Sequence, residues 1–454
     1  MYRWVPLARR LSGLRTNSLS NHLPLTMYAR LKRNEFLQGI LVMAGGTGLG
    51  RGVAVLASPF IARLYTPSDF GILATFASAV SILAVVATLR YELAVPLPKD
   101  DETAGDLLIL SLGIAAAMSS IFTLLLWPFG IHFLRWTNAE ELGPYLWLLP
   151  LSLFGAALYQ SVNGWAVRKK CFNDIAQAQV GLGVSQVAVQ VALGMLGAQP
   201  AGLVAGHMIG NLIGGGLLAF LLRGGWTACG RMGTRVASLR GTSYRYRQFP
   251  LLSAGSGLLN VAGLRLAPLL MAGYYGIEAA GSFALSQLVL GAPMLLVGNA
   301  VGQTYFGTAA SIARDRPSEL RGFFMRTSQQ LFMVGTLIGG VVALCAPWGF
   351  EGIFGERWAV AGEYARIMAP IMFVELAVGP VSATVYILNR QDLQLKWDAA
   401  RVIVIIAVFY FSDMLGLSAK SAVGGFACAM VVLYVAVFIL YKNALTTFCT
   451  SAIK

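Results

Sequence analysis

Apolar runs long enough to cross a lipid bilayer recur along most of this sequence. The first, residues 36–62, contains a single charged side chain, Arg51, close to its middle. A helix rises about 1.5 Å per residue, so this run covers ~40 Å, more than the ~30 Å hydrocarbon core of a bilayer. The runs are long and do not alternate apolar with polar residues, as the strands of a membrane barrel would. The sequence therefore predicts an all-α polytopic membrane protein.

Charged residues are few and unevenly placed. They make up 12% of the 454 residues, against about a quarter in soluble domains. We place twelve spans at residues 37–62, 71–96, 106–128, 143–163, 174–197, 200–222, 249–274, 279–304, 328–351, 367–388, 397–416 and 421–441. With the N-terminus inside, the cytoplasmic segments hold 25 of the 34 Lys and Arg residues. This bias predicts both termini in the cytoplasm, and it accounts for the net charge of +14 without a nucleic-acid partner.

A weak internal repeat divides the predicted spans into two sets of six. At an offset of 209 residues ASPFIARLY (57–65) matches LAPLLMAGY (266–274), and Gly71 matches Gly281 after one inserted residue. Such repeats are typical of transporters whose substrate site lies between the two units. We therefore expect two six-helix bundles around a central cavity. The predicted parts are a basic N-terminal segment (1–35), a first bundle (36–222), a basic linker (223–248), a second bundle (249–442) and a tail (443–454).

Ionisable side chains deep inside the predicted spans are candidates for a substrate or ion site. Arg51 and Arg265 each lie in the first span of one half, and the repeat places Asn260 opposite Arg51. A charge at that depth is costly unless it faces a cavity or a partner. Two arginine-bearing first helices indicate a cationic wall between the halves. Glu375, near the centre of the tenth span, is either a further cavity residue or the structural partner of Arg51.

Two charged pairs lie close to the ends of spans. Arg90 and Glu92 stand near the inner end of the second span, and Asp398 and Arg401 open the eleventh. Residues three apart on a helix are neighbours, so Asp398 and Arg401 can pair locally. Each pair is either a structural ion pair or part of a gate or ion-coupling relay, and both interpretations stay open.

Amide side chains are concentrated in the fifth span. Gln179, Gln186 and Gln190 recur at steps of seven and four, which places them on one helix face. That stripe either hydrogen-bonds neighbouring helices or lines a hydrated cavity. Gln303 in the eighth span is a further candidate contact for a polar substrate.

Motifs for catalysis, nucleotide binding and metal binding are missing from the sequence. It contains no GxxxxGK[ST], HExxH or GxSxG, and its five cysteines form no CxxC or CxxH pattern. We therefore expect no enzyme activity, no cofactor and no metal site, and energy from an ion gradient or the membrane potential. The first 34 residues lack the apolar core of a secretory signal, and Met27 is an alternative start.

Several segments together resemble the Wzx-type polysaccharide flippases, the PST family of the multidrug/oligosaccharidyl-lipid/polysaccharide (MOP) exporter superfamily. The similar segments are SPFIARLYTPSDFGILATF (58–76), LRYELAVPLPKDDETA (89–104), LLPLSLFGAALYQSVNGWAVRKKCF (148–172), YRQFPLLSAGSGLLN (246–260), GNAVGQTYF (298–306), IFGERWAVAGEYARIMAP (353–370) and ILNRQDLQLKWDAAR (387–401). Relatives often carry an arginine near ALSQLV, where this chain has Leu288.

The resemblance implies translocation of an undecaprenyl-pyrophosphate-linked oligosaccharide across the bacterial inner membrane, for O-antigen, capsule or exopolysaccharide assembly. Arg51 and Arg265 would bind the pyrophosphate, and the glutamines and Asn260 would bind sugar hydroxyls. Glu375 and Asp398 would bind a coupling H⁺ or Na⁺. Polymerases and chain-length regulators are possible protein partners.

Other function classes fit the sequence less well. A drug/cation antiporter of the same superfamily would line its cavity with acids rather than with arginines. A membrane-embedded polysaccharide polymerase or ligase would need a large outer loop with catalytic residues, and the predicted outer loops have only about 2–15 residues. A structural scaffold would leave Arg51 and Glu375 unexplained.

Overall fold

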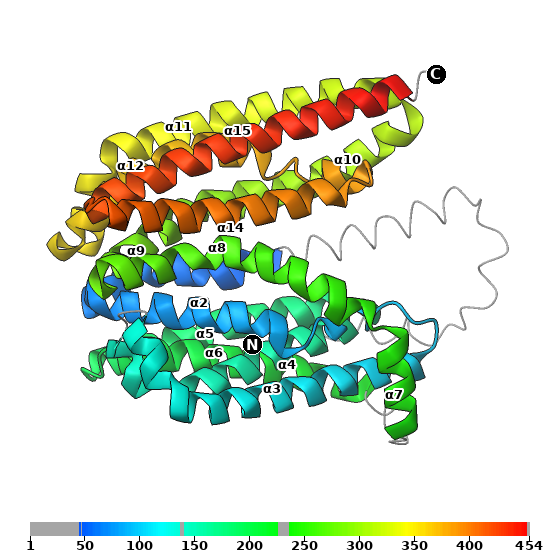
Figure 1. Cartoon of the computed structure of the whole chain (residues 1–454), viewed down its shortest axis with the longest axis horizontal. Coiled ribbons are helices and arrows are strands. Elements are labelled where there is room, and N and C mark those ends of the chain that lie inside the picture. The colour runs from blue at the N-terminus through cyan, green and yellow to red at the C-terminus, as the bar shows by residue number, and fades with distance from the viewer. Residues whose placement is uncertain (1–44, 47, 137–139, 226–235, 452–454) are drawn as a thin grey trace, which may run out of the picture.

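The computed structural model describes residues 45–46, 48–136, 140–225 and 236–451. These residues form helices joined by short 3₁₀ and π-helical turns, without a strand. The helices lie alongside one another in two stacked bundles, and the short helix α7 (Val236–Arg245) crosses one end (Figure 1). The predicted all-α polytopic fold is confirmed. The basic segment 1–35, the alternative start at Met27 and the beginning of the first span lie outside the described residues.

The first bundle contains a helix over residues 48–64 and five further helices. These are α2 (Pro67–Ala87), α3 (Asp101–Trp136), α4 (Leu148–Arg168), α5 (Phe172–Met195) and α6 (Ala201–Leu221). Glycines of α6 let it approach α5 closely, because a methyl group at Gly206 or Gly210 would collide with Gln186. Their spacing of four places them on one helix face, as the small-xxx-small packing pattern requires.

The second bundle follows after α7. It consists of α8 (Ala254–Tyr275), α9 (Ile277–Pro293), α10 (Asn299–Asp315), α11 (Leu320–Phe354), α12 (Ala359–Val378), α13 (Thr384–Ile387), α14 (Gln391–Met414) and α15 (Ala419–Ser451). α11 packs along α12, which also contacts α15, and α14 packs on α8. A π-helical turn, η5 (Met294–Gly298), joins α9 to α10 directly after Pro293. Proline disturbs helical hydrogen bonding, and π-turns often mark functional sites.

Seven of the described helical stretches are long and apolar enough to span a membrane on their own. They are Pro67–Ala87, Asp101–Leu126, Phe172–Met195, Ala201–Leu221, Phe249–Tyr275, Pro317–Phe354 and Ala419–Cys449. The helix over residues 48–64, α4, α12, α14 and the interrupted α9–α10 segment complete two sets of six. These additional helices are shorter, more polar or interrupted. The arrangement agrees with the twelve spans predicted from the sequence.

The end of the second span differs from the prediction. We expect this span to reach residue 96, but α2 ends at Ala87. Leu89 and Arg90 have φ values of +47° and +63°, a left-handed conformation that a right-handed helix cannot continue through. A 3₁₀ turn, η1 (Tyr91–Leu93), follows instead. Arg90 and Glu92 therefore lie in a turn beyond the helix rather than inside a span.

The start of α2 carries a capping box that the span prediction overlooks. The backbone N–H of Asp69 donates to Thr66 Oγ1 at 3.3 Å, and that of Thr66 donates to Asp69 Oδ2 at 2.7 Å. Pro67 occupies the first helical position, where its missing N–H is harmless. The signature TPSD is readable in the sequence and sets the helix start at residue 67.

Thr66→Ala should lower the free energy of unfolding by about 1 kcal/mol, because the Asp69 N–H loses its acceptor and the Asp69 carboxylate loses the Thr66 hydroxyl, which donates to it at 2.8 Å. The measurement is the thermal unfolding midpoint of the purified protein in detergent. Thr336→Ala is the control, since this exposed hydroxyl bonds only its own helix at Phe332 O. It should change stability by no more than about 0.5 kcal/mol. Equal losses in the two variants would contradict a capping role for Thr66.

A reciprocal glycine contact joins the two bundles. On α2, a Cβ at Gly71 would overlap the carbonyl oxygen of Ile277; on α9, a Cβ at Gly281 would overlap that of Pro67. Gly71 thus lies against Ile277, four residues before Gly281, and Gly281 lies against Pro67, four residues before Gly71. A contact that repeats when the partners are exchanged indicates a local two-fold relation between α2 and α9. The sequence repeat pairs the same two glycines.

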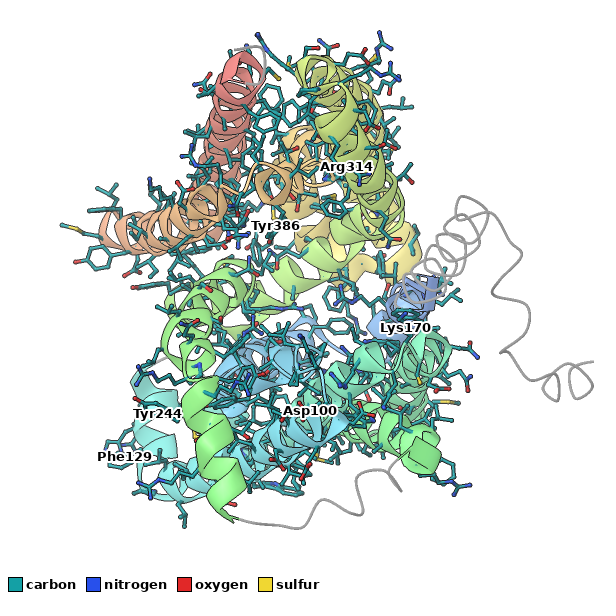
Figure 2. The ribbon with its side chains drawn as sticks, turned by 90° about the vertical axis from the view of Figure 1, so that its right-hand side faces the viewer. Asp100, Phe129, Lys170, Tyr244, Arg314 and Tyr386 are labelled. Carbon is teal, nitrogen blue, oxygen red and sulfur yellow. The ribbon has the colours of Figure 1, made fainter. Side chains whose placement is uncertain are left out.

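The bundles are also held together at the end that the charge distribution assigns to the outer side. Trp358 Nε1 donates to Ala62 O at 2.8 Å, and the Trp358 ring packs edge-on against Phe70 at 4.9 Å between centroids. The opposite end carries Asp100, Lys170 and Arg314 (Figure 2). Contacts between the first and second bundles therefore hold the end with Trp358 together in this structure.

Candidate functional site

Two adjoining cavities occupy the interior between the bundles. One, of about 480 Å³, is lined mainly by the first bundle and is called here the N-lobe cavity. The other, of about 680 Å³, is lined mainly by the second bundle and is called the C-lobe cavity. Four residues line both: Arg51, Arg265, Gln287 and Gly291. These four define the junction of a central cavity, and the predicted cavity between two bundles is confirmed.

Both arginines at the junction are unpaired within the part of the chain that the structure describes. Arg51 and Arg265 are exposed, yet they face the internal cavities. Neither side chain forms a hydrogen bond or ion pair with a described residue, and the two charges are close enough to interact electrostatically. Arg51 does not pair with Glu375, so the structural-pair interpretation is wrong for the described residues. A charge at membrane depth is costly unless a partner or water compensates it, so Arg51 and Arg265 are candidates for contact with an anion.

The glutamine stripe of α5 divides between packing and the cavity. Gln179 donates to the Tyr159 hydroxyl at 2.7 Å and lines neither cavity. Gln190 is buried and donates to Leu203 O at 3.3 Å, which ties α5 to α6 at the cavity edge. Gln186 lines the N-lobe cavity and has no hydrogen bond to a described residue. Gln179 and Gln190 therefore hydrogen-bond neighbouring helices, whereas Gln186 lines a cavity, so each of the two interpretations of the stripe holds for part of it.

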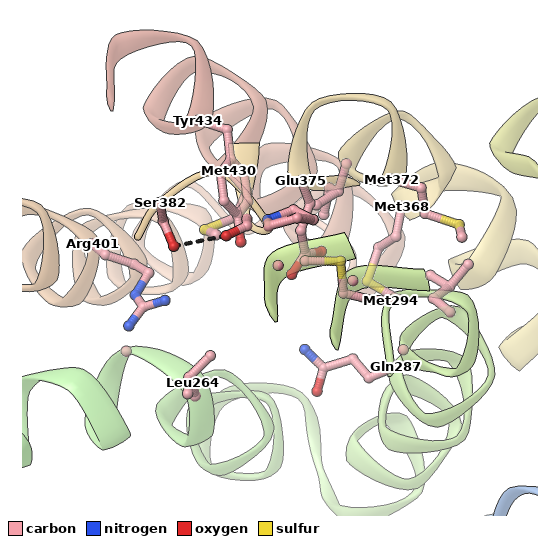
Figure 3. A pocket seen from close by; sticks show the side chains of 18 of the residues that line it. Leu264, Gln287, Met294, Met368, Met372, Glu375, Ser382, Arg401, Met430 and Tyr434 are labelled. Carbon is pink, nitrogen blue, oxygen red and sulfur yellow. Dashed lines mark hydrogen bonds between the residues drawn. The ribbon is translucent and has the colours of Figure 1, made fainter. Parts of the chain in front are cut away.

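Glu375 stands in the wall of the C-lobe cavity, close to Tyr434 and Arg401 (Figure 3). The same wall includes Gln303 and four methionines, Met294, Met368, Met372 and Met430. Two breaks in helices also reach this cavity: η5, and the turn between α12 and α13 that contains Ser382. Interrupted membrane helices at a cavity are a recurrent feature of transporter sites.

Asn260, Asp398 and Arg401 form a compact network between α8 and α14. Arg401 Nη2 lies 3.0 Å from Asp398 Oδ1 and donates to Asn260 O at 3.0 Å, while the Asn260 amide donates to Asp398 at 3.1 and 3.3 Å. A side chain at Gly263 would collide with the Arg401 guanidinium, so this glycine makes room for it. Asn260, which the repeat places opposite Arg51, instead bonds Asp398. Neither Asn260 nor Asp398 lines a cavity.

Arg90 and Glu92 pair at 3.4 Å in the turn after α2 and line neither cavity. The Arg90 guanidinium lies against Gly257 of α8, where a Cβ would collide with it. The turn of the first bundle is thereby in direct contact with the first helix of the second. A gating role for this pair remains a proposal.

Gln287 and Tyr434 are cavity residues that are not among the candidates from the sequence. Gln287 extends from α9 into the junction and has no hydrogen bond to a described residue; Tyr434 stands beside Glu375 (Figure 3). The signal for Gln287 is a single amide within the apolar run FALSQLVLG. No such signal distinguishes Tyr434, because aromatic residues are common in apolar spans.

Comparisons with known proteins support this architecture. A family model described as "Polysaccharide biosynthesis protein" matches residues 60–363, more than half of the chain. The succinoglycan biosynthesis transport protein ExoT of Rhizobium meliloti (strain 1021) is 22% identical over 329 residues, or 70% of this chain and 62% of that protein. The chain thus spans about three fifths of the length of this relative.

Solved structures show the same fold at low sequence identity. The lipid II flippase MurJ, in an inward closed conformation, aligns with a TM-score of 0.71 and 9% identity over 91% of each chain. An inward-facing MATE multidrug resistance transporter of the MOP superfamily gives 0.59 and 13%, over 90% of this chain and 95% of that one. A MOP superfamily transporter from Pyrococcus furiosus Vc1 (DSM3638) gives 0.59 and 14%, over 90% and 96%.

These findings confirm the resemblance that the sequence segments indicate. The matched region covers the first bundle from the end of its first helix and the second bundle up to the start of α12. About nine tenths of the chain shares the fold of an inward-facing MATE transporter of the MOP superfamily and of MurJ. The chain belongs to the polysaccharide biosynthesis protein family.

Proposed function

We propose that this protein is a flippase that moves an undecaprenyl-pyrophosphate-linked oligosaccharide across the bacterial inner membrane. Its product would feed O-antigen, capsule or exopolysaccharide assembly. The observation that carries the proposal is the pair of unpaired arginines, Arg51 and Arg265, at the junction of two internal cavities. The family match and the transport protein ExoT support the same direction.

The chemistry of arginine suits the headgroup of such a lipid. Its planar guanidinium binds phosphate oxygens through two parallel hydrogen bonds and keeps its charge at any physiological pH. Without an anion, Arg51 and Arg265 repel each other across the junction; a bound pyrophosphate would relieve that repulsion. Two cations at the junction also disfavour the alternative of a drug/cation antiporter. The polyprenyl tail would remain in the lipid while the headgroup crosses.

Alternating access would require the closed outer end to open. The contacts of Trp358 with Ala62 and Phe70 and the Gly71–Gly281 crossing hold that end together. Glu375 is the acid in the C-lobe cavity without an ion pair among the described residues, and we propose it as the site of a coupling H⁺ or Na⁺. Asp398 already has a cationic partner in Arg401, which makes it the weaker candidate. Polymerases and chain-length regulators would receive the product outside.

Replacing either junction arginine by a neutral residue should reduce export by about tenfold or more, since one charge-assisted phosphate contact is lost. The test is complementation of a flippase-null bacterium with Arg51→Gln, Arg51→Ala and Arg51→Lys, and with the same series at Arg265. Surface polysaccharide is measured relative to the amount of protein in the membrane. The lysine variants should keep partial activity because they retain the charge.

Arg366→Gln is the matched control, because Arg366 is an exposed arginine of α12 that lines neither cavity. It should export as the parent protein does. Wild-type export by Arg51→Ala and Arg265→Ala, at normal abundance, would show that the cationic junction is not the substrate site.

A further inference from the structure

The short helix α7 and the residues after it form a basic segment at the end that the charge distribution assigns to the cytoplasm (Figure 1). The sequence has no Asp or Glu between Asp174 and Glu278, a stretch that contains α7 and the predicted spans on either side of it. Arg240, Arg245 and Arg247 are exposed, and none of their side chains forms a hydrogen bond or ion pair with a described residue. Three cations therefore stand on this short segment without a counterion among the described residues.

The inner face of the segment packs on the first bundle. Thr242 is buried, the Tyr91 hydroxyl donates to Ser243 O at 3.1 Å, and α7 also contacts α3. Tyr246 and Phe249 lie 6.4 Å apart between ring centroids and pack against the apolar core of that bundle. These contacts fix the helix in place, so its exposed basic side chains present a defined surface.

The depth of this surface in the membrane follows from the span that begins directly after it. The span Phe249–Tyr275 starts two residues after Arg247, and Leu251 and Leu252 at its start are 71% and 70% exposed. Large apolar side chains that are exposed at the start of a span face lipid. Arg247 and the end of α7 therefore lie at the level of the lipid headgroups, where arginine and tyrosine side chains are favoured.

Tyrosine rings hold two of the arginine side chains. The Arg247 guanidinium lies 4.4 Å from the centre of the Tyr244 ring, which is itself 67% exposed, and the Arg245 guanidinium lies 5.8 Å from the centre of the Tyr246 ring. Cation–π attraction restrains a guanidinium without using its N–H donors. Those donors match phosphate oxygens, which can accept two parallel hydrogen bonds from one arginine.

The basic turn between α10 and α11 lies at the same end but differs in its acids. Arg314, Arg316 and Arg321 are exposed there, with Asp315 and Glu319 among them, and Arg316 pairs with Glu319 at 3.3 Å. Positive charge that only sets the membrane topology tolerates such acids, since Asp and Glu contribute little to topology. The segment at α7 is free of acids, so its charge stays available to a ligand.

We propose that Arg240, Tyr244, Arg245 and Arg247, called here the α7 surface, bind anionic phospholipid headgroups of the cytoplasmic leaflet. The guanidinium groups bind lipid phosphates, and the Tyr244 ring lies among the headgroups. The negative potential of this leaflet attracts basic segments next to a span. The ligand is a lipid of the bilayer rather than the substrate at the arginine junction, so the inference does not depend on the proposed flippase function.

A pair of phospholipids tests the proposal on the full-length protein. The purified protein in detergent is titrated with phosphatidylglycerol and, separately, with phosphatidylcholine, and bound lipids are counted by native mass spectrometry. It should bind phosphatidylglycerol about tenfold more tightly, because only this headgroup has a net negative charge. Equal affinity for the two lipids would overturn the proposal.

Two triple variants then locate the binding surface. Arg240→Gln, Arg245→Gln and Arg247→Gln together should abolish most of the preference for phosphatidylglycerol, whereas lysine at the same three positions should keep much of it. Arg314→Gln, Arg316→Gln and Arg321→Gln together remove the same charge at the same end and should leave the preference unchanged. An unchanged preference in the first variant, or an equal loss in the two glutamine variants, would show that the α7 surface is not the lipid site.

Discussion

Gly281→Ala is expected to destabilise the protein by about 1–3 kcal/mol, because the new methyl group would overlap the carbonyl oxygen of Pro67 on α2. The atom it meets belongs to the backbone of a packed helix, so no side-chain rotation can relieve the overlap. α2 and α9 would have to move apart, which breaks their contact along its whole length. Gly71→Ala should have a similar effect, since it meets Ile277 O from the other side. Thermal unfolding in detergent, together with abundance in the membrane, measures both.

The double variant gives the sharper test of this contact. Once one methyl group has moved α2 and α9 apart, the second methyl group no longer overlaps the facing backbone. The two losses should therefore not add, as is usual for residues in direct contact. Gly216→Ala is the control, because a methyl group at this exposed glycine of α6 would meet nothing within 4 Å and alanine favours helix. Additive losses, or a loss at Gly216 equal to that at Gly281, would contradict the two-fold crossing.

The repeat in the sequence could predict this crossing for a physical reason. A glycine needed for close backbone approach cannot be replaced, so Gly71 and Gly281 keep their places while the residues around them differ between the halves. The spans themselves were predictable because hydrocarbon imposes length and apolarity on every helix. Helix ends were not predictable to the same degree. The left-handed backbone conformation of Leu89 and Arg90 ends α2 nine residues before the predicted end of the span. Neither side chain is of a type that indicates this conformation.

The candidate site was predictable in kind but not residue by residue. Burial cost alone identifies Arg51 and Arg265 as residues that need a cavity or partner, and they meet at the junction. Spacing on a helix places Gln179, Gln186 and Gln190 on one face, but the neighbour at each level decides the outcome. Gln179 bonds Tyr159 of α4, and Gln190 bonds a carbonyl oxygen of α6. Of the three, only Gln186 has no hydrogen bond to a described residue.

The arginines inside this protein fall into two physical classes. Arg401 has a counterion: it pairs with Asp398, bonds Asn260 O and lies 5.8 Å from the centre of the Trp397 ring. Arg51 and Arg265 have no such partners among the described residues. A buried charge with a counterion adds little to the free energy of unfolding. A buried charge without one is unfavourable unless a ligand or water interacts with it. This contrast separates the proposed substrate contacts from the network behind them.

Removing one member of the buried pair should be among the most damaging single changes in the protein. Asp398 and Arg401 are only 4% and 5% exposed, so Asp398→Asn or Arg401→Met leaves the other charge buried without a counterion, at a cost of about 3–5 kcal/mol. The double variant, Asp398→Asn with Arg401→Met, removes both charges and should recover most of that loss in thermal unfolding. Its export activity then distinguishes the two roles left open by the sequence. A stable double variant that still exports shows a structural pair, whereas a stable but inactive one shows that the pair couples ion movement to transport. A double variant no more stable than the single ones would show that the charges themselves are not what holds α14 against α8.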